Sequence, residues 1–397
     1  MAAAEECGPA GPPRPDGVPA AVVPVRDLFL EPDYGERGSG LRDEYAVLHE
    51  LVKAARARLK PGTWDYLVGG AETETTFRRN RLALDELAFR PRVLRDVSRV
   101  DPGGRLLGIA LRIPIVLAPI GSLQDFDPGG GATTARAAID YGVVSMLSSA
   151  CEPGLEEVAS AAADGPKLYQ LYVRGDADWV DDHARRAVAC GYDGFALTVD
   201  LDYYGRRERD LAKRFKTTAR RRAVGPEFQM RFSWDDVKRL KDRFDIPLIL
   251  KGIATAEDTE IACEHGVEVI YVSNHGGRQL DHGRGGIEVL PEVVAAAAGR
   301  AQVVVDGGIL RGADVVKAMI LGADAVGIGR LTGFAVAAAG AAGVVRMLEL
   351  LEHEIRICLG LLGVNGYDEL DAGWLHRAPA VAEPHATSAF PLLAEGY

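Results

Sequence analysis

The segment Val269-Ile270-Tyr271-Val272-Ser273-Asn274-His275-Gly276-Gly277-Arg278-Gln279-Leu280-Asp281 starts with four apolar residues and continues into a polar, glycine-containing turn. The apolar run is typical of a strand that is buried on both faces. Glycines let a backbone approach a ligand closely, an imidazole titrates near neutrality, and a guanidinium can hold a carboxylate through two hydrogen bonds. His275 and Arg278 therefore suit a base beside an anion clamp, although a turn with one solvated arginine explains the segment alone equally well.

The same pattern of a short apolar run followed by a polar or glycine-rich turn occurs eight times beyond Pro114. A helix-length segment separates most of the runs, which predicts buried strands alternating with helices. Eight such repeats predict an α/β fold of the (β/α)8 TIM barrel type. A doubly wound sheet would be expected to show a GxGxxG after its first strand, and none follows residues 115–118. The expected strands are 115–118, 143–147, 168–173, 195–199, 247–250, 269–272, 302–305 and 325–328.

The barrel is expected to occupy residues 111–363, between less regular segments. Residues 1–24 are rich in Ala, Pro and Gly and lack the features of a signal peptide, so they are expected to be a disordered extension. Residues 25–110 are expected to form an N-terminal helical cap, and 364–397 a C-terminal tail. The long loop after the fourth strand, residues 201–246, is expected to lie over the catalytic face as a lid. Within the cap, helices are expected at 43–60, 64–72 and 75–84.

The composition narrows the partners and the cellular compartment. A net charge of −11 argues against nucleic acid or an anionic membrane surface as a partner. The five cysteines show no CxxC and no metal-like spacing, which predicts reduced thiols in a cytoplasmic protein without a metal site. The alanine-rich run at 334–345 is interrupted by glycines, so a packed helix is expected there and no membrane span.

The residues that end the expected strands are the candidates for chemistry, because TIM-barrel active sites lie at the C-terminal ends of the strands. Each of the eight ends carries a polar, small or glycine residue. The last two ends, Asp306-Gly307-Gly308 and Gly329-Arg330, match the common phosphate site after strands seven and eight.

Several of these strand ends together resemble one enzyme family. The segments are Thr198-Val199-Asp200, Gly205-Arg206-Arg207, Leu250-Lys251-Gly252, Ser273–Asp281, Asp306-Gly307-Gly308 and Gly329-Arg330. They resemble the FMN-dependent α-hydroxy-acid oxidases and dehydrogenases, which include glycolate oxidase, lactate oxidase and monooxygenase, and mandelate dehydrogenase. The resemblance runs from about Tyr45 to about Gly363, and it implies a TIM barrel, a tightly bound FMN and oxidation of a 2-hydroxy acid to a 2-oxo acid.

The resemblance also implies roles for individual residues. His275 would be the base that starts the oxidation, and Asp200 would orient its imidazole and stabilise the cationic form. Arg207 and Arg278 would clamp the substrate carboxylate, although each could instead form a surface ion pair. The remaining substrate contacts would come from Tyr66, in Trp64-Asp65-Tyr66, and from Tyr172, which would face the substrate oxygen; for both, core packing is the alternative.

The cofactor contacts follow from the same resemblance. Lys251 would lie against the flavin N1–C2=O edge, where its positive charge stabilises the reduced anionic flavin. Leu310 occupies a position that is often an arginine near the phosphate, and the neighbouring Arg311 is expected to replace it. The ring and ribityl contacts would be Pro119, Gly121, Ser148, Gln170, Thr198 and Ser273, and the ribityl and phosphate contacts Asp306, Gly307, Gly308, Gly329 and Arg330.

Departures from the family pattern bear on the substrate. Ala150 stands where glycolate oxidase has a tryptophan, and Gly121 where it has an alanine. Both changes open volume beside the flavin, so the expected substrate is larger than glycolate, with an aryl side chain as in mandelate as one candidate. Asp202, Tyr203 and Tyr204 replace a Thr-Pro-Arg-Leu-like stretch, and they would contact either a polar or amine-bearing substrate or the solvent.

Three functions remain open at this point. The first is FMN-dependent oxidation of a 2-hydroxy acid, with oxygen or another acceptor and, by resemblance, a homotetramer. The second keeps the fold but changes the reaction, to a biosynthetic flavoenzyme acting on a decorated substrate or a lactate-monooxygenase-like oxidative decarboxylation. The third is a barrel that only binds flavin, against which the combination of His275, Asp200, Arg207 and Arg278 argues.

Overall fold

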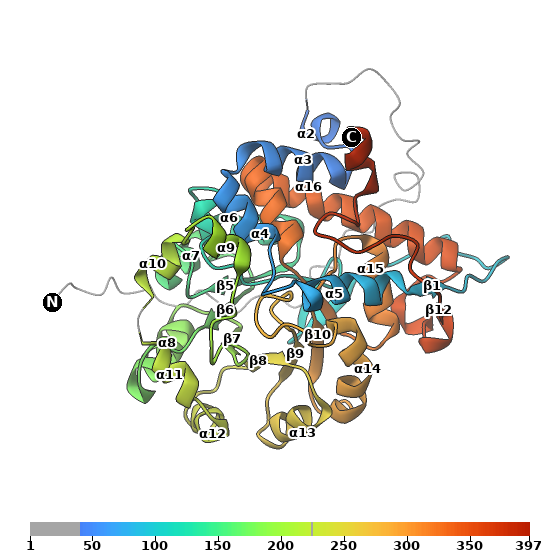
Figure 1. Cartoon of the computed structure of the whole chain (residues 1–397). Coiled ribbons are helices and arrows are strands. Elements are labelled where there is room, and N and C mark those ends of the chain that lie inside the picture. Colours follow the sequence, from blue (N-terminus) through green and yellow to red (C-terminus); the bar gives the residue numbers. More distant parts are fainter. Residues whose placement is uncertain (1–39, 224) are drawn as a thin grey trace.

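Eight parallel strands close into a barrel in the computed structural model, which describes residues 40–223 and 225–397 (Figure 1). The strands pair in chain order, and the last returns to the first through Val326 opposite Ile115. This confirms the predicted (β/α)8 TIM barrel. Each strand overlaps its expected run: β4 (Ile115–Leu117), β5 (Val144–Ser148), β6 (Lys167–Leu171), β7 (Gly194–Thr198), β8 (Leu248–Ile253), β9 (Val269–Val272), β10 (Gln302–Val305) and β11 (Ala325–Ile328).

Helices cover the outside of the barrel (Figure 1). Two of them begin at side-chain caps, because Asp176 accepts a hydrogen bond from Trp179 N and Thr255 accepts one from Asp258 N. Their apolar faces pack on the outward-facing strand residues in one continuous core. The helices are α6 (Gly130–Tyr141), α7 (Leu155–Ala161), α8 (Ala177–Ala189), α12 (Trp234–Arg243), α13 (Ala256–Glu264), α14 (Gly286–Ala297), α15 (Gly312–Ile320) and α16 (Arg330–Leu362).

An antiparallel hairpin closes the N-terminal end of the barrel. It consists of β2 (Gly104–Leu106) and β3 (Ile109–Leu111). Leu106 and Leu111 are buried in one apolar cluster with the inward-facing residues of the strands. Because this end is filled with apolar side chains, the polar chemistry is left to the opposite, C-terminal end.

The predicted helical cap is present, with different helix limits. The helix expected at 43–60 is interrupted, because Tyr45 leaves the helical conformation and the Glu50 carboxylate accepts hydrogen bonds from Ala46 N and Val47 N to start a new helix. The helix expected at 64–72 begins earlier, because Pro61 occupies its first turn, where no amide donor is needed. The cap helices are α2 (Leu41–Glu44), α3 (Leu48–Arg58), α4 (Pro61–Val68) and α5 (Thr75–Asp85).

The cap and the C-terminal segment are paired with each other. The strand β1 (Leu87–Phe89) pairs antiparallel with β12 (Leu375–Arg377), and α3 packs against α16. The segment 364–397, expected as a tail, thus folds back onto the cap. The extension expected at residues 1–24 lies outside the described residues.

The alanine-rich run expected to be a packed helix lies in α16, which bends where Ala339 and Gly340 leave the helical conformation. The segment Arg330–Glu369 is long and apolar enough to cross a membrane by length and composition. However, 56% of its most apolar window is buried inside the protein, as in a core helix.

The long loop after β7 contains three short helices before α12. Its middle is tied to the loop after β4, because the Thr218 amide and hydroxyl both donate to Asp125 and the Ala219 amide donates to Ser122 Oγ. Its far end is tied to β7 through Gln229, which donates to Thr198 O. We call residues 201–223 and 225–232 the lid, because these residues lie across the C-terminal end of the barrel. The short helices are α9 (Glu208–Ala212), α10 (Thr218–Arg222) and α11 (Pro226–Arg231).

Candidate active site

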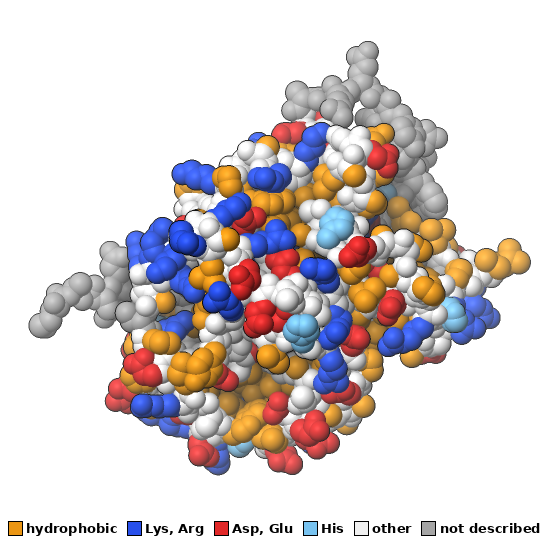
Figure 2. Space-filling view, in the orientation of Figure 1, with side chains coloured by type: hydrophobic (Ala, Val, Ile, Leu, Met, Phe, Trp, Pro, Cys, Tyr) orange, Lys and Arg blue, Asp and Glu red, His pale blue; other side chains and the backbone are white. Residues whose placement is uncertain are grey.

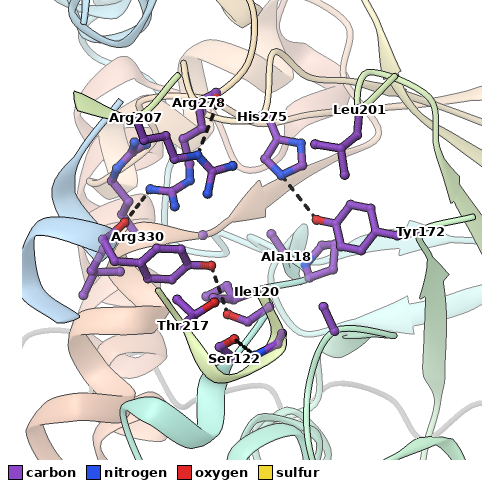
Figure 3. Close-up of a pocket in the computed structure, with 18 of the residues that line it drawn as sticks. Ala118, Ile120, Ser122, Tyr172, Leu201, Arg207, Thr217, His275, Arg278 and Arg330 are labelled. Atoms are coloured by element: carbon purple, nitrogen blue, oxygen red, sulfur yellow. Dashed lines mark hydrogen bonds between the residues drawn. The ribbon is translucent and has the colours of Figure 1, made fainter. Parts of the chain in front are cut away.

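A cavity of about 650 Å³ opens at the C-terminal end of the barrel, between the strand ends and the lid (Figure 3). It is lined by residues from the strand ends, the cap and the lid, so segments far apart in the chain meet there. Among the residues expected from the sequence, those that line the cavity are Tyr66, Pro119, Gly121, Ala150, Tyr172, Asp202, Tyr204, Arg207, Lys251, His275, Arg278, Asp306, Gly307, Gly308, Gly329 and Arg330.

The turn that carries His275 has an unusual backbone. His275, Gly276 and Gly277 have φ angles of 57°, 64° and 74°, all in the left-handed region that disfavours residues with a Cβ atom. A Cβ on Gly277 would lie 2.5 Å from the backbone of Phe77, and one on Gly276 would lie 2.7 Å from Arg330 Nη1. Gly277 therefore lets the turn pack against the cap, and Gly276 lets it pack against Arg330 of α16. His275 retains a strained conformation of the kind found at functional sites.

The imidazole of His275 lies between a carboxylate and a phenol. Its Nδ1 is 3.1 Å from Asp200 Oδ1, and its Nε2 is 3.3 Å from the Tyr172 hydroxyl (Figure 3). A carboxylate at Nδ1 favours the tautomer that is protonated there, which leaves Nε2 free to accept a proton from the cavity. Gly252 makes this pairing possible, because a Cβ at that position would lie 2.8 Å from Asp200 Cβ.

Burial and charge set the protonation of this group. Burial lowers the pKa of His275 below its ordinary value, against the opposing effect of Asp200. Burial works against the ionised form of Asp200, but His275 outweighs it and lowers the pKa of this carboxyl. Burial also raises the pKa of Tyr172, which stays a neutral phenol. At neutral pH the site thus holds an uncharged imidazole beside an ionised carboxylate, which is the state that a general base needs.

Two arginines, Arg207 and Arg278, lie beside His275 in the cavity (Figure 3). Arg278 Nη1 donates to the carbonyl oxygens of Tyr66 and Gly69, while its buried Nη2 has no partner among the described residues. Arg207 donates to the Tyr204 hydroxyl and to Arg278 O. Carbonyls and phenols orient the two guanidinium groups without neutralising them, so the pair can bind an anion.

Polar groups lie where the resemblance places the flavin ring. Lys251 Nζ is 2.8 Å from Ser273 Oγ and 3.2 Å from Asp306. The amide of Gln170 and the hydroxyl of Thr198 are buried and find no hydrogen-bond partner for these atoms among residues 40–223 and 225–397. Buried polar atoms are normally paired, so these groups fit a polar ring that supplies the missing donors and acceptors.

The opposite end of the cavity suits a phosphate. Gly307 and Gly308 have φ angles of 103° and 78°, and Gly329 precedes α16, whose N-terminal amides favour an anion. Burial lowers the pKa of Arg330 to about 9, and its Nε has no partner in the described part of the chain. An anion bound here would compensate this charge, so the donor set fits the phosphate of FMN.

Some expected cofactor contacts are absent from the lining of the cavity. Arg311 does not replace the missing arginine at Leu310, because Glu354 on α16 accepts hydrogen bonds from its Nε and Nη2 and Ala389 O accepts one from its Nη1. Arg311 is absent from the cavity lining, whereas Leu310 forms part of it. Ser148, Gln170, Thr198 and Ser273 are buried in the strand ends directly behind the lining.

The residues that hold the histidine turn were missed in the sequence. Asn274 exchanges two hydrogen bonds with Asn80 of α5, and Gln279 donates to the carbonyl oxygens of Asp200 and Tyr203. Asp281 accepts hydrogen bonds from Thr73 and Thr76, which lowers the pKa of its carboxyl to about 2 although burial opposes this. Their presence in the 273–281 segment was a signal, but the partners of Asn274 and Asp281 lie 194 to 208 residues away and those of Gln279 lie 76 and 79 residues away.

Comparison with known proteins identifies relatives across almost the whole described chain. A family model described as FMN-dependent dehydrogenase matches residues 55–377. Glycolate oxidase 1 of Oryza sativa subsp. indica is 38% identical over 364 residues, covering 86% of this chain and 98% of the relative. Glycolate oxidase 3 of Arabidopsis thaliana is 39% identical over 349 residues, covering 82% of this chain and 95% of the relative. A crystal structure of mandelate oxidase with benzoyl-formic acid superposes with a TM-score of 0.78 at 38% identity, covering 85% of this chain and 100% of that one.

Proposed function

The chain belongs to the family of FMN-dependent dehydrogenases, and we propose that it oxidises a 2-hydroxy acid to the 2-oxo acid with oxygen as electron acceptor. The observation that carries the proposal is the imidazole of His275, hydrogen-bonded to Asp200 and lying beside two arginines that form no ion pair with the residues at 40–223 and 225–397. A proton acceptor beside a carboxylate clamp suits a 2-hydroxy acid, because C2 of such an acid carries both a hydroxyl group and a carboxylate. Relatives named glycolate oxidase and mandelate oxidase support the same substrate class.

The substrate would be oriented by its carboxylate. Arg278 presents an unpaired Nη2, and Arg207 lies beside it, so a carboxylate can accept charge-assisted hydrogen bonds from both. Tyr66 adds a hydroxyl, which donates to Gly121 O in the free protein. The carboxylate bound there would place the C2 hydroxyl toward His275 Nε2 and Tyr172.

His275 would then act as the proton acceptor. Its Nε2 accepts the proton of the C2 hydroxyl, and Asp200 stabilises the resulting imidazolium. FMN, which Lys251, Gln170, Thr198 and the phosphate end of the cavity would hold, would take up the two electrons and the hydrogen that are lost when the C2–H bond breaks. Lys251, beside Asp306, places a cation at the ring site, where it favours negative charge.

Anaerobic mixing tests the proposal directly. The holoenzyme is mixed with glycolate, lactate, longer aliphatic 2-hydroxy acids and mandelate, each as both enantiomers, and the flavin absorbance is followed. Bleaching by at least one acid, followed by recovery and peroxide release in air, is the expected result. If no 2-hydroxy acid bleaches the flavin, the proposal is wrong, and a shortened acid in place of the 2-oxo acid would indicate oxidative decarboxylation.

The pH profile is expected to fall on the acid side. Because burial lowers the pKa of His275 below 6.5, the imidazole is neutral at pH 7 and becomes protonated only below its own pKa. kcat/KM should therefore be constant from pH 7 to 8 and decline tenfold per pH unit below the pKa of the base. Steady-state rates in a buffer series from pH 4.5 to 8.5 measure this, and an activity that rises as the pH falls below 6 would contradict it.

Pocket volume is expected to set substrate size. Ala150 and Gly121 both line the cavity, and a Cβ on Gly121 would lie 3.2 Å from Ala150 Cβ, so the two small residues leave room together. We propose that the enzyme prefers a 2-hydroxy acid larger than glycolate, with aryl acids such as mandelate among the candidates. Ala150→Trp should shift the kcat/KM ratio toward glycolate by about 10- to 100-fold, the range for about 1–3 kcal/mol of pocket discrimination. A wild-type enzyme that prefers glycolate would overturn this proposal.

The cytoplasmic location and the homotetramer stay predictions.

A further inference from the structure

The cavity contains more positive charge than one substrate carboxylate requires. Besides Arg207 and Arg278, its lining includes Arg174, two residues beyond Tyr172, and Arg220 on α10 of the lid. Figure 2 shows Lys and Arg side chains gathered on the side of the molecule where Figure 1 places α9 and α10. Neither of these two additional guanidinium groups forms an ion pair with a residue that the structure describes.

Arg174 is a half-buried cation without an acidic partner. It follows Tyr172 by two residues in an extended segment, so both side chains are directed to the same side, into the cavity. Its guanidinium forms no hydrogen bond or ion pair with the residues at 40–223 and 225–397. Burial lowers the pKa of Arg174, and the opposing electrostatic effects of Tyr172 and Tyr204 do not offset this shift.

Arg220 lies on the same aromatic ring as Arg207. Its guanidinium carbon is 3.9 Å from the centre of the Tyr204 ring, and that of Arg207 is 4.2 Å from it. The Arg220 guanidinium forms no ion pair within the part of the chain that the structure describes. Both guanidinium groups pack on the ring of Tyr204, which places Arg220 close to Arg207 of the carboxylate clamp. The N–H groups of Arg220 stay available for an anion.

Nearby acids do not remove this charge. Glu152 at the cavity wall is paired with Arg222, the neighbour of Arg220 on the lid. Asp210 is buried behind the clamp, where burial raises the pKa of its carboxyl although Arg278, Arg207 and Arg220 oppose the rise. Asp202 also lines the cavity, but its side chain is exposed to water, which solvates it at little cost.

We propose that Arg174 and Arg220 form a second anion subsite, which binds a carboxylate at the far end of the substrate side chain. This inference rests on the proposed function and narrows it to 2-hydroxy dicarboxylic acids. The C1 carboxylate would occupy Arg207 and Arg278, as in a monocarboxylic substrate, and the terminal carboxylate would reach past Tyr204 to the subsite. A half-buried guanidinium gains most from an anion, because water cannot fully solvate it.

Three matched substrates test the subsite in the wild-type holoenzyme. They are 2-hydroxyglutarate, its 5-amide, and 5-amino-2-hydroxypentanoate, which carry a negative, neutral and positive terminal group on similar chains. kcat/KM for the diacid should exceed that for the amide by about tenfold or more, the effect of a charge-assisted hydrogen bond pair. Equal values for diacid and amide, or a preference for the amine through Asp202, would overturn the proposal.

Variants then assign the preference to the two arginines. Arg174→Met and Arg220→Met, alone and together, should bring the diacid-to-amide ratio close to one, mainly through KM. Arg221→Met is the matched control, because Arg221 lies on the same helix but outside the cavity lining, and it should keep the wild-type ratio. A wild-type ratio in the double variant would overturn the assignment.

A binding measurement separates this subsite from the proposed reaction. The product analogues 2-oxoglutarate and 2-oxohexanoate are titrated into the oxidised holoenzyme, and the flavin spectrum reports the Kd without turnover. Tighter binding of the diacid, lost in the double variant, supports the subsite. If monocarboxylic 2-hydroxy acids bleach the flavin but neither assay favours the diacid, the subsite fails while the proposed function stands; if no 2-hydroxy acid bleaches the flavin, the function itself fails.

Discussion

His275→Gln is expected to slow the reduction of the bound flavin by 2-hydroxy acids by about 10²–10⁴-fold, the usual contribution of a general base. Glutamine can still donate a hydrogen bond toward Asp200, but it cannot take a proton at the position of Nε2. The rate constant for anaerobic bleaching in a stopped-flow instrument measures the effect, because it is independent of the reaction with oxygen. The FMN content should stay at the wild-type value.

A second histidine serves as the control. His265 follows α13 on the outside of the barrel and stacks on Trp234, with ring centres 5.7 Å apart, so His265→Gln should reduce the flavin at the wild-type rate. A loss of less than tenfold in His275→Gln, with FMN fully bound, would show that another group removes the proton. Tyr172, at 3.3 Å from Nε2, would then be the first residue to examine.

Arg278→Lys is expected to lower kcat/KM by about 10²–10³-fold although the positive charge is kept. Arginine holds the carbonyl oxygens of Tyr66 and Gly69 with Nη1 and presents Nη2 to the cavity, and a single ammonium group cannot do both. Removing one partner of a buried charged pair costs about 2–5 kcal/mol, and most of this loss should appear in KM. Steady-state kinetics with the best substrate measure kcat and KM. Spectral titration with its 2-oxo product measures the loss of binding.

Arg206→Lys provides the comparison. Arg206 is exposed, pairs with Glu208 and lies outside the cavity lining, so this variant should keep the wild-type KM. A wild-type KM in Arg278→Lys would mean that Arg207 alone binds the carboxylate. Thermal unfolding of both variants separates loss of binding from loss of the cap contacts that Arg278 also makes.

The local pattern of the chain predicted the barrel well, because buried strands and amphipathic helices depend on residues that are close in sequence. Helix limits were less well predicted in the cap. The break after Glu44 depends on the carboxylate of Glu50 and the conformation of Tyr45, and the apolar stripe through 43–60 continues across it. A periodic pattern shows which face is buried, but it does not show that the backbone stops being helical.

The candidate site was predicted only in part, because a local pattern marks a segment but does not show where each side chain points. His275, Arg278 and Lys251 lie in short segments whose composition marks them out, and the structure brings them to one cavity. Arg311 was expected at the phosphate because it is adjacent to Leu310, but adjacent residues in a turn point in different directions, and Glu354 binds its guanidinium. Arg174 follows Tyr172 by two residues and Arg220 lies in the expected lid, but nothing in the chain indicates that their guanidinium groups share one cavity.

The sequence by itself determined the number and order of the strands and the strand ends expected to carry chemistry, and it supplied the candidates for the base and the clamp. These depend on runs of a few residues and on the chemistry of single side chains. Only the tertiary structure decided which charges stay uncompensated among the described residues, how Asn274, Gln279 and Asp281 hold the histidine turn, and that Arg220 approaches Arg207 on the ring of Tyr204. The physical reason is that compensation depends on the distance between charges in space, and the path of the chain sets that distance.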